Sequence, residues 1–141
     1  MKDGTEWRWQ FLGFESEEEG RPVQSWYNGL PDDAKEEISD LLGYLEKMTS
    51  TLWRLPEFDP LNGEGGISEL RPRNVVLETG GEVEEITYRL YGFFGPKPLK
   101  AYTLLHGARK NEKNDRDGKR IAKWRLGQLE GGRARVHEFE F

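Results

Sequence analysis

The 141 residues include no cysteine, which excludes a thiol nucleophile and a thiolate metal site, and the chain is long enough to bury a core without disulfides. Its formal net charge of -5 is unevenly distributed, because residues 1–69 carry a net -10 and residues 70–141 carry a net +5. With no apolar run near the roughly 20 residues that span a bilayer, and no signal peptide, we expect residues 1–141 to form one cytoplasmic domain without membrane contact.

The first half of the chain predicts one strand and two helices. Residues 5–14 alternate between apolar and polar side chains, as a half-buried strand does, and acidic residues follow. Residues 21–48 carry apolar side chains at helical intervals, interrupted by Asn28, Gly29 and Pro31. This pattern predicts a short helix and then a long helix over residues 31–48.

The second half predicts three strands, a helix and a final strand. The strands fall in residues 67–78, 84–95 and 99–108, and their short connections predict an antiparallel meander. Residues 115–129 have the pattern of a helix, and residues 134–141 alternate as a terminal strand. This order of elements predicts an α+β fold.

Alternation divides the middle strand into a core face and an exposed face. The first face holds Ile86, Tyr88, Leu90 and Phe94, and the second holds Thr87, Arg89, Tyr91 and Phe93. The strand that follows leads into a dense group of cations, which are Arg109, Lys110, Lys113, Arg116, Lys119 and Arg120. A charge run of this kind is also typical of a solvated loop before a solvated helix.

Two sequence stretches carry a resemblance to a known family. "ISELRPR", followed by "ITYRLYGFFGPKPLKAYTLLHGARKNEKND", a basic helix and a short final strand, resembles the RelE/HigB-type toxins of the RelE/ParE superfamily. These toxins belong to bacterial and phage type II toxin–antitoxin systems, and the resemblance covers residues 21–141. It implies a RelE-like fold in which a twisted antiparallel sheet of four to five strands carries an N-terminal helical hairpin and a C-terminal helix. In this chain the domain would have an extended acidic N-terminal segment.

The resemblance implies an mRNA endoribonuclease that acts at the ribosome without a metal or other cofactor. A cognate DNA-binding antitoxin would neutralise it, so its partners would be that antitoxin, mRNA and the ribosome. An alternative within the same superfamily is a non-catalytic interaction protein, such as a gyrase inhibitor or a phage binding protein. With two histidines and no cysteine, the sequence also predicts no metal site.

RNA cleavage of this kind needs cations around a phosphate and groups that move protons. The catalytic positions that the resemblance implies are Arg71, Arg73, Arg89, Lys110 and His137. The RNA-binding positions are Tyr91, Arg109, Lys113, Lys119, Arg120, Arg133 and Arg135. Arginine can hold phosphate oxygens bidentately, and a lysine crowded by other cations has a lowered pKa and can act as a base.

These assignments predict one concave, basic surface. We expect Arg71, Arg73, Arg89, Lys110 and Lys113 to converge on it, with the exposed sheet face that carries Arg89 and Tyr91 as its floor. Structural alternatives remain open at this point. Arg71 and Arg73 can be cross-strand partners of glutamates, and His106 can be a structural histidine next to an apolar strand.

Overall fold

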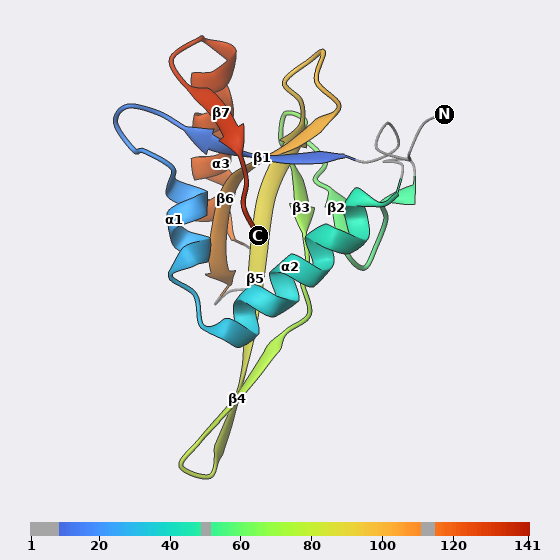
Figure 1. Cartoon of the computed structure of the whole chain (residues 1–141), viewed down its shortest axis with the longest axis vertical. Coiled ribbons are helices and arrows are strands. Elements are labelled where there is room, and N and C mark those ends of the chain that lie inside the picture. Colours follow the sequence, from blue (N-terminus) through green and yellow to red (C-terminus); the bar gives the residue numbers. More distant parts are fainter. Residues whose placement is uncertain (1–8, 49–51, 111–114) are drawn as a thin grey trace.

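The computed structural model describes residues 9–48, 52–110 and 115–141, which form three helices and a seven-stranded sheet (Figure 1). The strands are β1 (Gln10–Glu15), β2 (Phe58–Pro60), β3 (Ser68–Leu70), β4 (Val75–Thr79), β5 (Glu82–Phe94), β6 (Ala101–Lys110) and β7 (Arg135–Glu138). The helices are α1 (Pro22–Asn28), α2 (Asp32–Glu46) and α3 (Arg116–Glu130). The α+β class is confirmed, and the sheet has more strands than the four to five expected.

The strand order is β2-β3-β5-β6-β1-β7, and β4 pairs with β5 alone. Every pair is antiparallel except β1 with β6, which is parallel. The expectation of an antiparallel sheet is therefore wrong at this one pair. β1 lies between β6 and β7 and is buried on both faces, because Phe11 belongs to one hydrophobic core and Phe14 to another. Burial on both faces is typical of a strand with a parallel neighbour.

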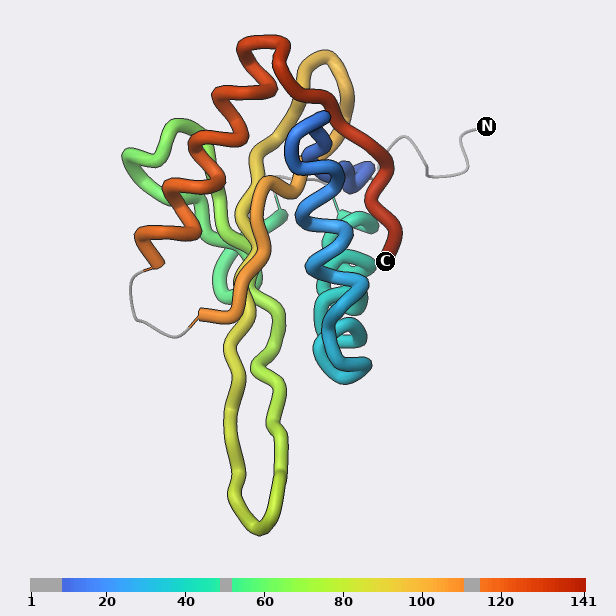
Figure 2. The backbone as a smooth tube through the Cα atoms, turned by 90° about the vertical axis from the view of Figure 1, so that its left-hand side faces the viewer, coloured from blue at the N-terminus to red at the C-terminus, as the bar shows by residue number. Residues whose placement is uncertain are grey.

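Helices cover both faces of the sheet (Figure 2). α1 and α2 pack on one face, where Leu42 and Leu90 belong to the larger core. α3 packs on the other face, where Tyr91, Leu105 and Leu126 belong to a second core. The sheet thus separates the acidic α2 from the basic α3.

Both predicted helices of the first half form, with α2 ending at Glu46. Its buried residues recur at helical intervals, which explains why it packs on the sheet, and Asp32 and Asp33 lie in its first turn. The predicted C-terminal helix also forms. Its cap is Asp115, whose Oδ1 accepts a hydrogen bond from the Gly118 N–H at 2.9 Å.

The predicted strand of residues 67–78 is divided into β3 and β4 by residues 71–74. Pro72 has no N–H to donate to a ladder, so the pairing with β5 stops there and resumes at Val75. β2 lies in residues 51–66, where the proline and glycine content of the sequence predicts a loop. Residues 5–8 of the predicted first strand lie outside the described residues.

The two predicted faces of β5 exist, but the second face is not exposed along its whole length. Tyr91 has an exposed fraction of 0% because α3 covers it. The expectation that Tyr91 forms an open floor for RNA is therefore wrong. Arg89, two residues earlier, lies beyond this cover, and 16% of its side chain is exposed.

Candidate nucleic-acid interface

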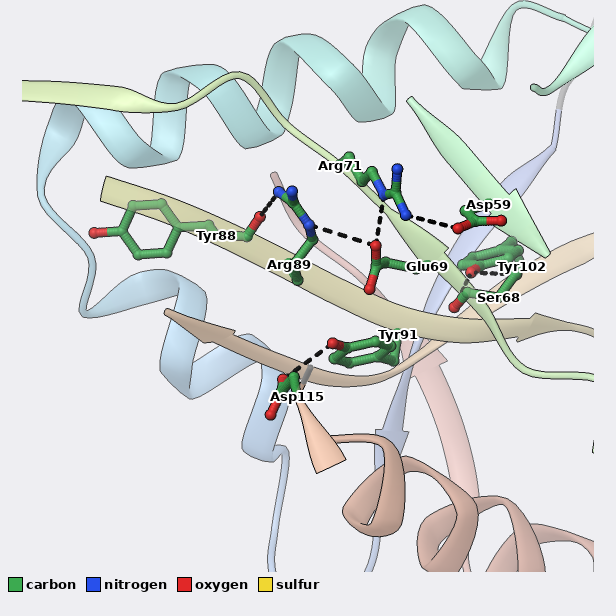
Figure 3. Close-up of polar contacts among 9 residues, drawn as sticks. All are labelled: Asp59, Ser68, Glu69, Arg71, Tyr88, Arg89, Tyr91, Tyr102 and Asp115. Carbon is green, nitrogen blue, oxygen red and sulfur yellow. Dashed lines mark hydrogen bonds and ion pairs between the residues drawn. The ribbon is translucent and has the colours of Figure 1, made fainter. Parts of the chain in front are cut away.

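A buried carboxylate holds two arginines at the centre of the candidate site (Figure 3). Arg71 Nε donates to Glu69 Oε1 at 2.6 Å, and Arg89 Nε lies 3.4 Å from the same oxygen. The Glu69 side chain is only 3% exposed. Arg71 also donates from Nη2 to Asp59 Oδ2 at 2.6 Å. Arg71 thus has two carboxylate neighbours, of which Glu69 stands two residues earlier in the chain and Asp59 lies on the neighbouring strand β2.

Strand pairing explains why these side chains meet. Glu69 of β3 lies opposite Tyr91 of β5, so side chains two residues away from each point to the same face. Arg71 and Arg89 occupy those positions. Their convergence was predicted from the sequence, and Glu69 was not among the predicted site residues. Its signal was its place two residues before Arg71 on the same predicted strand.

Arg89 keeps part of its guanidinium available. Its Nη1 donates to the Tyr88 carbonyl oxygen at 2.8 Å, and its Nη2 has no partner among the described residues. Burial lowers the pKa of Arg89, and the Glu69 carboxylate opposes that effect. Because a guanidinium is a very weak acid, arginine remains charged in proteins, and Arg89 can bind a phosphate oxygen through Nη2.

Tyr91 has a structural role in this face. Its hydroxyl donates to Asp115 Oδ2 at 3.0 Å, and Asp115 in turn caps α3. The ring lies 6.3 Å from the His106 ring, nearly parallel to it. Burial, followed by the charges of Glu69 and Asp115, raises the pKa of Tyr91. Tyr91 therefore anchors the start of α3 to β5, and its ring is not available to stack on a base.

His106 is held in the same buried layer. Its Nδ1 lies 3.4 Å from Arg125 Nη1, and Arg125 also donates to the Leu105 carbonyl oxygen and to Glu19. Burial, with the Arg125 charge second, lowers the pKa of His106. These contacts support the structural alternative for His106.

Four cations line one side of α3. Arg116, Lys119, Arg120 and Lys123 recur at the spacing of a single helix face. They face the β2–β3 loop across a hollow of about 530 Å³ that Leu61, Asn62 and Glu64 also line. Figure 2 shows this loop, in green, beside α3.

Acidic side chains neutralise part of this cationic face. Lys123 Nζ lies 3.1 Å from Glu64, and Arg120 Nη2 lies 3.0 Å from Asp117. The sequence prediction included Lys119 and Arg120 but omitted Lys123, and it named Arg116 only among the clustered cations. The helical spacing of the four residues was the signal that could have identified them as one surface.

The register of β5 with β6 places two further cations. Lys110 lies opposite Thr87, so it shares the sheet face of Arg89. Arg109 lies opposite Tyr88 on the other face, where it forms an ion pair with Glu84. Arg109 is therefore separated from the Arg89 group, and Lys113 lies outside the described residues.

Arg73 and His137 do not join the central group. Arg73 is exposed and lines a hollow of about 450 Å³ next to α2, where Glu37, Asp40 and Glu57 are neighbours. Arg71 lines the same hollow, and among the described contacts none joins Arg73 to Glu69 or Arg89, so the structure does not bring Arg73 into the expected group.

His137 lies opposite Gly13 in β7, and β6 and β1 separate β7 from β5. Phe139, two residues after His137 and therefore on the same side of the chain, packs in the core under α1 and α2. His137 therefore points to the sheet face opposite Arg89. Its Nδ1 donates to the Glu138 carbonyl oxygen at 2.8 Å, and burial lowers its pKa. The expectation that His137 shares a site with Arg89 is wrong for both reasons.

The two C-terminal arginines lie near the far edge of the sheet. Arg135 donates from Nε to Glu15 Oε2 at 2.6 Å, and Arg133 donates to Gln128 at 3.3 Å. They line a hollow that also contains the exposed Trp124. This hollow is separate from the hollow lined by Arg116, Lys119, Arg120 and Lys123.

The site can bind an anion more readily than it can move a proton. Arg89, Lys110 and the α3 cations can hold phosphate oxygens, whereas both histidines are committed to structural contacts. Within residues 9–48, 52–110 and 115–141, no three His, Cys, Asp or Glu side chains are grouped to hold a metal. None of the three helices described is long and apolar enough to span a membrane. The sequence matches no protein-family model and no curated protein.

Proposed function

We propose that this chain is a RelE/HigB-type toxin that cuts mRNA without a metal ion, at the ribosome. The observation that carries the proposal is that Arg89 and Lys110 share the sheet face on which α3 packs, and that Glu69 pairs with both Arg71 and Arg89. RNA would follow the α3 cations and reach Arg89 where the cover of α3 ends. The motifs in residues 67–73 and 86–114 that resemble this family support the same activity.

In the proposed reaction a ribose 2′-hydroxyl attacks the adjacent phosphorus. The new O–P bond forms as the bond from phosphorus to the 5′-oxygen breaks, which leaves a 2′,3′-cyclic phosphate. Arg89 would contact the phosphate through Nη2 and stabilise its growing negative charge. Lys110, on the same face, would accept the hydroxyl proton, and water would protonate the departing oxygen.

Glu69 would position the arginines in this scheme without touching RNA. It is buried and contacts both Arg71 and Arg89, so it fixes the directions of the two guanidinium groups. Asp59 performs a similar task for Arg71 alone. A toxin of this kind would have a co-encoded DNA-binding antitoxin, would act in the cytoplasm, and would be inhibited when the antitoxin covers the basic face.

The second candidate is a non-catalytic interaction protein of the same fold, such as a gyrase inhibitor. It is favoured by one observation: two carboxylates partly neutralise Arg71 and Arg89, and the histidines are used elsewhere. In this alternative the basic face binds a partner and no bond is broken.

Induced expression followed by primer extension on mRNA distinguishes the two candidates. The endoribonuclease should arrest growth and produce new 5′ ends within coding sequences. Growth arrest with intact mRNA, together with loss of DNA supercoiling activity in a gyrase assay, would support the second candidate. Normal growth with intact mRNA and active gyrase would contradict both.

A further inference from the structure

The β4–β5 hairpin projects beyond the rest of the molecule (Figures 1 and 2). Its two strands are joined by Gly80 and Gly81, whose φ angles of 58° and 86° form the tight turn that only glycine adopts easily. Thr79 and Glu82 face each other directly across this turn. Among the described residues, β6 pairs with β5 only from Thr87 onward, so each strand of the projecting part has one free edge, and on β4 this edge runs the whole length of the strand.

The free edge of β4 offers backbone groups to a partner. In a hairpin with a two-residue turn, the pair next to the turn is hydrogen-bonded and the pairs then alternate. Thr79, Leu77 and Val75 therefore bond to β5, and the N–H and C=O groups of Val76 and Glu78 point away from it. No hydrogen bond from another described residue reaches those groups.

The side chains around this edge do not protect it from pairing. Natural edge strands are commonly blocked by lysine, proline or a bulge, and the sequence of β4, VVLET, has neither residue and a regular register. Val76 is 60% exposed and Val83 is 68% exposed, and the register puts both on one face of the hairpin. A strand added at this edge would place a side chain directly beside Val76.

The negative charge around the β4 edge favours a positively charged partner. The hairpin carries Glu78, Glu82, Glu84 and Glu85. At its base, Asp33, Glu36 and Glu37 of α2 line a hollow of about 230 Å³ together with Asn74, Val75 and Val76. A second copy of this chain would bring equally acidic hairpins together, so like charges disfavour a pair of identical edges.

We propose that the free edge of β4 binds an extended, basic segment of a partner protein by β-strand addition. An apolar side chain of that segment would lie beside Val76, and a lysine or arginine would lie beside Glu78. This surface is formed by α2 and the hairpin, away from the α3 cations, so it is independent of RNA cleavage.

The test is binding of two short peptides to the full chain. In both, a valine and a charged residue stand two positions apart and so share one face, and the charged residue is lysine in one peptide and glutamate in the other. Fluorescence anisotropy should give at least ~10-fold tighter binding for the lysine peptide, because its charge complements the edge. Hydrogen exchange should slow at the Val76 and Glu78 amides when this peptide is bound. Equal affinity for the two peptides, or protection confined to α2, would overturn the proposal.

Two variants locate the binding. Val76→Pro removes an outward N–H without removing a β4–β5 bond and should weaken binding about tenfold. Glu78→Lys leaves the backbone unchanged and should weaken it roughly 2–5-fold, whereas Glu130→Lys on α3 makes the same charge change and should have no effect. Parent-like binding by Glu78→Lys would contradict the proposal, as would a dimer whose Val76 and Glu78 amides are protected without peptide.

Discussion

The two sides of the molecule differ in charge and in how their polar groups are paired. On the α3 face, Arg116, Lys119 and Lys123 line a hollow, and the guanidinium of Arg89 pairs with a buried carboxylate. The side formed by α2 and the hairpin presents carboxylates around an open strand edge. A net charge of -5 conceals this division, because folding places the acidic α2 and the basic α3 on opposite sides of one sheet. The proposed RNA and the proposed basic segment would therefore bind different sides of the protein.

Among the substitutions considered, removal of the Arg89 side chain should have the largest effect on RNA cleavage. We predict that Arg89→Ala lowers RNA cleavage by about 10²–10³, because one charge-assisted donor to the transition state is commonly worth that factor. Arg109→Ala is the matched control, since Arg109 lies on the neighbouring strand but on the opposite face. Quantitative primer extension measures both variants. Equal loss of cleavage in the two would mean that the face assignment is wrong.

Substitution of Glu69 tests how much its buried ion pairs with Arg71 and Arg89 stabilise the fold. Glu69→Gln removes the charge between Arg71 and Arg89 and should lower the free energy of unfolding by about 3 kcal/mol, as breaking a buried ion pair does. Asp59→Asn removes a carboxylate that is 30% exposed and should cost about 1 kcal/mol or less. Urea unfolding gives both values. Similar values for the two variants would show that Glu69 does not hold the pair.

The α3 cations should contribute to affinity through charge alone. Replacing Arg116 or Lys119 by alanine should reduce the slope of log affinity for single-stranded RNA against log salt by about 0.7 for each phosphate that the variant no longer neutralises. Lys47→Ala, at the end of α2, is the control. Fluorescence anisotropy at several salt concentrations measures the slope. A slope that changes with Lys47 and not with Lys119 would reverse the roles of the two faces.

Acid should weaken the fold slightly through the two histidines. Burial lowers the pKa of His106 and of His137, so the unfolded chain binds protons more readily than the folded chain. Their contribution to stability is present above the unfolded pKa of about 6.5 and is lost as the pH falls below it. The free energy of unfolding should therefore decrease between pH 7 and pH 5. The double variant His106→Gln, His137→Gln should show a flatter dependence in urea unfolding.

The sequence predicted the helices and strands better than it predicted which strands lie side by side in the sheet. Helical spacing identified α2 and α3, and alternation separated the two faces of β5 correctly. The parallel pairing of β1 with β6 was missed because it joins segments that are far apart in the chain. Local patterns do not specify such pairings.

The candidate site was predicted only where strand pairing alone determined it. Arg89 and Lys110 share a face because β5 and β6 are adjacent and antiparallel, and the sequence allowed that inference. The burial of Tyr91 depends on where α3 packs, and the position of His137 depends on the strand order. Both are properties of the tertiary structure, which residue spacing does not encode.

The central claim is that RNA binds the α3 face and avoids the acidic side of the molecule. Amide hydrogen exchange with and without a single-stranded RNA tests it directly. We predict slower exchange in the first half of α3 and in the strand segments next to Arg89 and Lys110, with no change in α2 or the β4–β5 hairpin. Protection confined to α2 or the hairpin, with α3 unchanged, would contradict the account.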